Sequence, residues 1–175
     1  MKIKNRGFTL FELIVIIGIL LLFIGLSLVY YNNYSEGISL QGETKNLSNA
    51  LALASKKAQV AELAEQCTTF LGYRVEITSE SSYELQRCCG SDLLNPQLTV
   101  NKVYNLPINI KIVSSIPSTV LYKKLSGGVV INENEENTSL KITLQNNALK
   151  SKNCINININ KVGIVETGER QNCEQ

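Results

Sequence analysis

The 175-residue sequence contains no histidine and no tryptophan, one methionine and three prolines. Without histidine, the chain has no imidazole to act as a general base or to bind a metal, which excludes His-based catalysis and His metal ligation. The prolines come late in the chain: none occurs between Phe8 and Pro96. Since proline breaks helices, its absence leaves this part of the chain free to form a long one.

The sequence also lacks a surplus of charge outside a short N-terminal leader. It has 17 Lys and Arg and 15 Asp and Glu residues; Lys2, Lys4 and Arg6 precede an apolar run and Glu12 lies at its head, so the rest is neutral. A neutral domain gives no electrostatic reason to expect nucleic-acid or anionic-surface binding. Positive residues before the apolar run predict that the N-terminus is cytoplasmic and the remainder lies outside.

The longest feature that is present is the apolar run at residues 8–31. As a helix it would reach about 36 Å, enough to cross a hydrocarbon core about 30 Å thick. Tyr30, Tyr31 and Tyr34 at its end suit an aromatic belt at the membrane interface. A secretory signal is the first alternative, but its apolar region is shorter and ends in a small-x-small cleavage site, which is missing here.

Glu12 is the single charged residue in this run. An acid at the centre of a membrane helix costs about 2.5 to 3.5 kcal/mol on insertion scales, and one substitution to leucine would remove that cost. At a helix N-terminus, in contrast, an acid is favoured by the exposed N–H groups and their partial positive charge. The plain alternative is that Glu12 only satisfies this dipole near the headgroups of an ordinary signal anchor.

Residues 7–13 read Gly-Phe-Thr-Leu-Phe-Glu-Leu, which resembles the type III signal of type IV pilins and of the pseudopilins of type II secretion. The resemblance implies that a prepilin peptidase and methyltransferase cuts between Gly7 and Phe8 and N-methylates Phe8. It also implies that Glu12 is needed for assembly with other pilin subunits. The Phe8 amine of one subunit and Glu12 of its neighbour would attract strongly in apolar surroundings, which would set the axial register.

The predicted organisation has four parts. Residues 1–7 are a leader peptide, 8–31 a transmembrane helix and assembly segment, 32–66 an amphipathic continuation of that helix, and 67–175 a β-rich head. Between residues 45 and 66 leucines and alanines recur close to the helical period. Gly37 and Gly42 weaken the segment before it, so a bend there, or two helices joined by a loop, is the alternative.

After Cys67 the apolar residues alternate with polar ones, as they do in strands with one buried face. A long helix followed by seven to nine short strands predicts an α+β fold with the helix packed on an antiparallel sheet or sandwich. The expected strands lie at residues 73–77, 83–88, 98–104, 108–112, 120–125, 129–132, 140–144, 155–159 and 162–165.

Within the pilin group, the head is most similar to the minor pseudopilin and minor pilin type that includes GspH, FimT and FimU. There a tyrosine-bearing hairpin follows the helix, and a late Ile-x-Ile-x strand leads into a turn with glycine. Residues 73–88 and 155–165 match that outline. The proline that the family often has within the membrane helix is absent, and Gly18 and Gly25 are the weak points instead. This departure favours a minor subunit, of a pilus or of a secretion pseudopilus.

Five cysteines lie beyond the apolar run. Cys88 and Cys89 are adjacent rather than spaced as CxxC, which argues against a zinc or redox motif, and disulfides are the usual role of cysteine outside the membrane. We expect Cys154 to pair with Cys173 and Cys67 to pair with either Cys88 or Cys89. The remaining cysteine would be a small core residue.

The sequence therefore predicts a structural subunit, anchored by one membrane pass and exposed, after assembly, at the cell surface or in the periplasm. An unprocessed signal-anchored surface protein is one alternative. A DNA-binding minor pilin of a competence pilus is another; some FimT-type proteins carry a basic C-terminal motif with two arginines, whereas residues 163–170 here contain one, Arg170. The lysines that would have to supply such a patch are Lys123, Lys124, Lys150, Lys152 and Lys161.

An enzymatic function has little support in the sequence. Glu133, Glu135 and Glu136 lie in an Asn-rich acidic loop without the spacing or the glycine of an EF-hand. We find no nucleophile–base arrangement, phosphate-binding loop or metal cluster. The expectation is a protein that is not an enzyme and uses no cofactor or metal.

Overall fold

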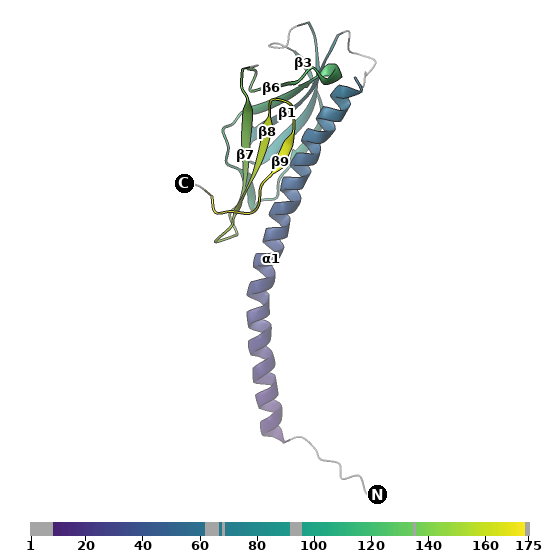
Figure 1. Ribbon diagram of the computed structural model, residues 1–175. Coiled ribbons are helices and arrows are strands. Elements are labelled where there is room, and N and C mark those ends of the chain that lie inside the picture. The colour runs from purple at the N-terminus through teal and green to yellow at the C-terminus, as the bar shows by residue number, and fades with distance from the viewer. Residues whose placement is uncertain (1–8, 62–66, 68, 92–95, 135, 174–175) are drawn as a thin grey trace, which may run out of the picture.

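A computed structural model describes residues 9–61, 67, 69–91, 96–134 and 136–173. One long helix, α1 (Leu10–Gln59), extends from a β-rich head (Figure 1). The first half of α1 projects away from the head, and the second half packs along it. We call the end of the head from which α1 emerges the base and the opposite end the top. The predicted α+β fold, with a long N-terminal helix packed on antiparallel sheets, is confirmed.

The head contains two antiparallel sheets among the described residues. The larger has the strand order β3-β2-β1-β5-β6 and the smaller β4-β7-β8-β9. A short 3-10 helix, η1 (Lys124–Ser126), follows β5. The strands are β1 (Phe70–Ser79), β2 (Ser82–Cys89), β3 (Gln97–Asn105), β4 (Ile110–Ile112), β5 (Ser118–Lys123), β6 (Val129–Ile131), β7 (Ser139–Asn146), β8 (Cys154–Asn160) and β9 (Val165–Thr167).

The core lies between the second half of α1 and the inner faces of both sheets. Leu47 and Leu51 of α1 are fully buried, and the small side chains of Ala54 and Ala58 let the helix approach the strands closely. Both sheets contribute isoleucines, valines and leucines from alternate positions, as the period-two pattern predicted. These include Val75, Ile77, Val120, Ile131, Ile142, Leu144, Ile157 and Ile159.

The helix differs from its prediction at two places. It is continuous through Gly37 and Gly42, which contradicts the alternative of two helices joined by a loop. Packing explains the continuity, because Gly37 and Leu40 are already buried against the head. At the other end α1 stops at Gln59, where 32–66 was predicted to be helical: residues 60 and 61 form a turn, with Ala61 in the left-handed region at φ 46°. Residues 62–66 lie outside the described part.

Four strand predictions were wrong in their ends. Asn132, predicted as the end of the strand at residues 129–132, lies in a turn after β6 with φ 51°. Ile108 is 99% exposed in a turn rather than in β4, since Pro107 cannot donate to a ladder and its carbonyl accepts the Ile110 N–H at 2.9 Å. Leu125 lies in η1 with φ 54°, not in β5. The last hairpin is shifted toward the C-terminus, because the Asn160 side chain accepts the backbone N–H groups of residues 162 and 164 and makes that segment the turn.

Strand β3 differs from the other strands because one of its apolar faces is exposed to solvent. Its outward-facing Leu98, Val100 and Val103 are between 42% and 49% exposed. On its other face Tyr104 stacks on Tyr83 of β2 with ring centroids 4.7 Å apart. A bulge between the β2 residues Leu85 and Gln86 interrupts the pairing with β3, which is typical of an edge strand protected against further pairing.

Candidate functional site: the apolar helix and its junction with the head

The first turn of α1 is closed by a capping box. The Glu12 backbone N–H donates to Thr9 Oγ1 at 3.2 Å, and the Glu12 carboxylate accepts from the Thr9 backbone N–H at 2.9 Å. Thr9 Oγ1 also donates to the same carboxylate at 2.9 Å. The Glu12 carboxylate thus satisfies the backbone N–H of Thr9, the residue that caps α1, within its own chain. The Thr-x-x-Glu spacing is the sequence signal for this cap, and our sequence expectations did not include it.

Gly7 and Phe8, where cleavage and methylation were predicted, lie outside the described residues. Glu12 is therefore the one predicted assembly residue that the structure describes. Its carboxylate is at the N-terminal end of α1, far from the head (Figure 1). Among the described residues, Thr9 is the one hydrogen-bond partner of the Glu12 carboxylate. The carboxylate is therefore accessible to a neighbouring chain.

The first half of α1 is apolar on every side and contacts nothing in the head. One 18-residue window of α1 has a mean hydropathy of 3.0, and none of it is buried. Phe11 is 76% exposed, and Phe23 is 63% exposed farther along. Such a helix is long and apolar enough to cross a membrane, and no other helix among the described residues is. Tyr30, Tyr31 and Tyr34 follow it, at least 67% exposed.

The apolar half ends where Glu36 bonds to the head. Asn146, at the end of β7, is fully buried; its side-chain amide donates to the Glu36 carboxylate at 2.8 Å and to the Glu36 backbone carbonyl at 3.1 Å. Asn109 donates to the other carboxylate oxygen at 3.2 Å. Glu36 is the first charged residue after Glu12. The contact fixes α1 to the smaller sheet just beyond the tyrosines, and no sequence pattern identified it.

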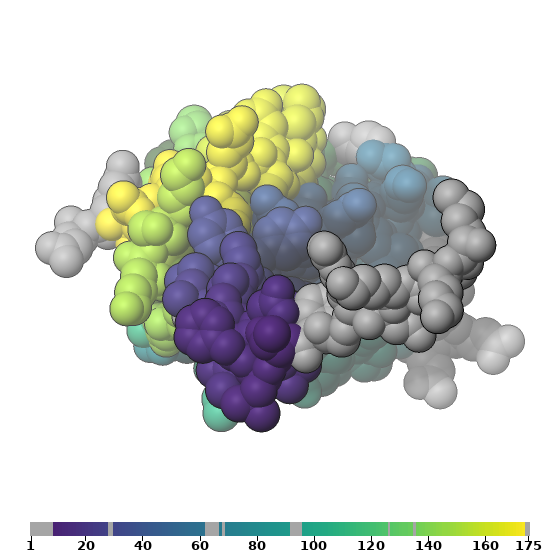
Figure 2. Space-filling model, turned by 90° about the horizontal axis from the view of Figure 1, so that it is seen from below, coloured from purple at the N-terminus to yellow at the C-terminus, as the bar shows by residue number. Residues whose placement is uncertain are grey.

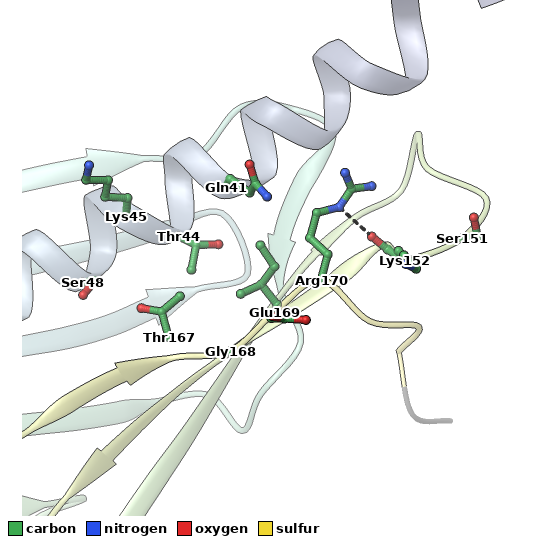
Figure 3. Close-up of a pocket in the computed structure, with 11 residues that line it drawn as sticks. Gln41, Thr44, Lys45, Ser48, Ser151, Lys152, Thr167, Gly168, Glu169 and Arg170 are labelled. Atoms are coloured by element: carbon green, nitrogen blue, oxygen red, sulfur yellow. Dashed lines mark hydrogen bonds between the residues drawn. The ribbon is translucent and has the colours of Figure 1, made fainter. Parts of the chain in front are cut away.

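Gly37 makes room for Arg170 at the same junction. An added Cβ at Gly37 would collide with the Arg170 guanidinium, so the side chain of Arg170 lies directly against the helix backbone. Arg170 Nε donates to the Lys152 backbone carbonyl at 3.1 Å. The C-terminal segment is thereby held between α1 and the loop after β7 (Figure 3). Gly37, considered in the sequence as a helix-weakening residue, is needed here for close approach.

Two disulfides close the head. Cys67 pairs with Cys89 at a Cα–Cα distance of 5.8 Å, which chooses between the two partners that the sequence left open. Cys154 pairs with Cys173 at 5.2 Å and ties the C-terminal segment to β8. The second bond holds the segment that carries Arg170 in place beside α1.

Cys88 is the free cysteine and is fully buried. Adjacent strand residues point to opposite faces, so Cys88 faces away from Cys89 and packs with Leu121 and Val130 on the outer side of the larger sheet. Burial raises the pKa of its thiol to about 11. At neutral pH it therefore remains protonated, which suits a packing residue rather than a nucleophile.

The candidate DNA-binding lysines do not form one patch. Lys123 and Lys161 line a hollow near Gln59 at the top of the head, whereas Lys152 lines a groove at the base. The acidic loop that contains Glu133 and Glu136 follows β6, and Glu133 lies 3.4 Å from Arg74. Among the described residues there is no group of three Cys, Asp or Glu side chains that could hold a metal ion.

Comparison with known proteins finds no matching family model, no matching curated protein and no matching solved structure.

Proposed function

We propose that this chain is a structural subunit of a type IV pilus or of a type II secretion pseudopilus, most similar to the minor subunits of these assemblies. The observation that carries the proposal is the combination of the Gly7-Phe8 motif, an acid five residues into the mature chain, and a helix whose apolar half is wholly exposed. A single soluble chain gains nothing from such a helix, because an exposed apolar surface of this size is unfavourable in water.

In this proposal the leader keeps the N-terminus in the cytoplasm and the apolar half of α1 crosses the membrane. The peptidase removes residues 1–7, and Phe8 is N-methylated. On assembly, helices leave the lipid and pack against one another, so the apolar half exchanges one apolar environment for another. Glu12 then pairs with the Phe8 amine of a neighbouring subunit, and a pair out of register leaves two charges unpaired in low dielectric.

The capping box is compatible with this role. Before assembly, the backbone N–H and the hydroxyl of Thr9 satisfy the Glu12 carboxylate within the membrane-inserted chain. A carboxylate has lone pairs for more than these bonds, so a neighbouring amine can be added without breaking the cap. The disulfides of the head fit an oxidising compartment outside the cytoplasm.

The proposal is tested by intact mass and N-terminal sequencing of the protein purified from native membranes, with and without reductant. We expect a mature chain that begins at N-methylated Phe8 and gains four hydrogens on reduction of its two disulfides. A chain that still begins at Met1, in a host with the peptidase, would make the protein a signal-anchored surface protein and remove the assembly role of Glu12.

A further inference from the structure

The base of the head lies close to the end of the apolar half of α1. Tyr31, the last residue of the apolar run, and Glu36, which bonds to the head, are five residues apart, or about 7.5 Å along a helix. The polar headgroup layer on each side of a hydrocarbon core is roughly 5 to 8 Å thick. When the apolar half fills the core, the base of the head therefore lies at the level of the lipid headgroups.

The loop between β7 and β8, residues 147–153, lies at the lowest point of the head in Figure 1. Strand β7 ends at Asn146, beside Glu36, and the chain returns in β8, so this loop continues past the Glu36 contact toward the apolar half. It contains two lysines, Lys150 and Lys152, which are both exposed, and no acid. Seen from below, the loop, in yellow-green, and the C-terminal segment, in yellow, lie beside the helix (Figure 2).

Arg170 adds a third cation at a fixed position. Its Nε donates to the Lys152 carbonyl at 3.1 Å, and its guanidinium lies against Gly37 of α1 (Figure 3). Within the described ranges its two terminal nitrogens donate no hydrogen bond, and no ion pair involves Arg170, Lys150 or Lys152. Arg170 and Lys152 line a groove of about 760 Å³ between α1 and the C-terminal segment. A guanidinium with two unused terminal nitrogens can bond two phosphate oxygens at once.

Most carboxylates at the base already have partners. Glu36 accepts from Asn146 at 2.8 Å, and Glu80, in the turn that joins β1 and β2 at the same end of the head, lies 4.0 Å from Lys111. Glu169 is exposed and is the one carboxylate of the described base without a partner. The head as a whole is neutral, so its composition gave no reason to expect an anionic partner. Its base, in contrast, presents three unpaired cations and one unpaired carboxylate.

An exposed isoleucine lies at the same end of the head. Ile108, in the loop between β3 and β4, is 99% exposed. Its neighbour Asn109 donates to the Glu36 carboxylate at 3.2 Å and accepts the Asn147 backbone N–H at 2.9 Å, which places Ile108 next to the lysine-bearing loop. An apolar side chain is unfavourable in water but favourable at the boundary between headgroups and acyl chains. Apolar and cationic side chains together are typical of surfaces that lie on membranes.

We propose that the base of the head rests on anionic phospholipid headgroups of the membrane that α1 crosses, with Ile108 at the interface and the three cations bonded to lipid phosphates. The inference rests on one part of the proposed function, the membrane crossing of the apolar half, and holds whether or not the leader is removed. Lipid is favoured over a protein partner because α1 itself brings the base of every chain to the membrane surface.

The contact has a consequence for the orientation of α1. As a helix the apolar run reaches about 36 Å, which exceeds a hydrocarbon core of about 30 Å and is accommodated by a tilt. Interfacial anchors set the direction of such a tilt. Since α1 and the head are packed together, lipid contacts at the base tilt the helix toward the side on which the loop between β7 and β8 lies.

The chain contains no tryptophan, so a single introduced tryptophan can report the depth of one position. The full chain is placed in vesicles of phosphatidylcholine, phosphatidylglycerol and a phospholipid with a spin label on its headgroup, which quenches nearby fluorescence. We expect Ile108→Trp to be quenched about threefold more than Val162→Trp. Val162 is also exposed but lines the hollow at the top of the head. Phe23→Trp, in the apolar half, verifies insertion by its blue-shifted emission.

Charge reversal tests whether lipid phosphates hold the base. In the Ile108→Trp chain, Lys150→Glu combined with Lys152→Glu should lower quenching to the level of Val162→Trp, and omission of phosphatidylglycerol should weaken it. Lys124→Glu combined with Lys161→Glu is the matched control. It changes the net charge by the same amount, but these exposed lysines lie in η1 and beside the hollow at the top of the head. Quenching in this control should stay unchanged.

Equal quenching of Ile108→Trp and Val162→Trp, with Phe23→Trp inserted, overturns the inference and leaves the proposed function intact. A blue-shifted Ile108→Trp that the spin-labelled lipid does not quench overturns it as well, because another chain then covers the base. Phe23→Trp emission typical of water would contradict the membrane crossing, and with it both proposals. A native chain that still begins at Met1 contradicts the assembly role alone, and the lipid contact remains.

Discussion

The two halves of α1 form one continuous helix, yet they are built for different surroundings. Residues 10–27 are mostly apolar and exposed on all sides, whereas residues 36–59 are amphipathic, and Leu40, Leu47 and Leu51 have no exposed surface. Their acids differ in the same way: Glu12 bonds only within its own helix turn, and Glu36 bonds to the head. Helix propensity is shared between the halves, so the difference lies in what each half needs from its environment.

Removing the charge of Glu12 should have the largest effect on function and little on folding. We expect Glu12→Gln to be inserted and processed but to lower the fibre yield more than tenfold, because in the proposed assembly the Phe8 amine of the neighbour then lacks its partner. Thr9→Ala is the control, since it breaks the capping box while it keeps the charge. N-terminal sequencing and the yield of sheared fibres are measured for both. Equal loss in the two variants would reduce Glu12 to a helix cap.

Truncating a leucine should change the free energy of unfolding of the head when the leucine lies in the second half of α1, but not when it lies in the apolar half. Leu47 is fully buried in the head, so Leu47→Ala should lower the free energy of unfolding by about 2 to 5 kcal/mol. Leu21 is 64% exposed, and Leu21→Ala should leave the unfolding of the head within about 0.5 kcal/mol of wild type. Urea unfolding of the full chain in detergent, followed by near-ultraviolet circular dichroism, measures both. A destabilised Leu21 variant would mean that the apolar half packs on the head.

The bond between Cys154 and Cys173 should stabilise the base of the head by the next largest amount. The two cysteines are 19 residues apart, and closing a loop of this size is worth about 3 kcal/mol on the chain-entropy estimate. The double variant Cys154→Ser and Cys173→Ser should therefore unfold at lower urea concentration. Hydrogen exchange should rise in residues 165–173 and stay unchanged in residues 10–34. Loss of protection in the apolar half would contradict the separation of the two regions.

The comparison also shows what the sequence could and could not predict. The apolar half and the buried face of the second half follow from composition and period, and alternation places the inward isoleucines of β7 and β8. Contacts that join distant residues were not predictable. The bond from Glu36 to Asn146 spans 110 positions and has no local signal, and Gly37 was considered only for its helix propensity.

Turns explain the wrong strand ends. The Asn160 side chain acts through two hydrogen bonds and Pro107 through a missing donor, and the alternating pattern runs past both residues without change. The exposed row on β3 shows the same limit, because alternation predicts which residues share a face but not whether anything covers that face.

Removing the charge of Glu36, where α1 meets the head, should lower the free energy of unfolding by less than loss of the disulfide does. In Glu36→Gln the buried Asn146 amide loses a charged acceptor, and we expect a loss of about 1 to 2 kcal/mol in the free energy of unfolding. Glu43→Gln is the matched control, because the one hydrogen bond that the Glu43 carboxylate accepts from the described residues is an exposed bond from Asn46 at 3.3 Å. Its effect should stay below about 0.5 kcal/mol. Equal losses in the two variants would remove the special role of the junction.

The smallest change in stability is expected when alanine replaces Gly37 or Gly42. We expect a gain at Gly42 and none at Gly37. An added Cβ at Gly42 meets nothing within 4 Å, so Gly42→Ala should stabilise the helix by up to about 1 kcal/mol through backbone entropy. At Gly37 the same methyl group collides with the Arg170 guanidinium, which must move and strain its bond to the Lys152 carbonyl. Gly37→Ala should therefore gain nothing in urea unfolding, and Arg170→Ala in that background should recover the gain. A Gly37→Ala variant as stable as Gly42→Ala would show that the Arg170 contact at the base of the head is readily displaced.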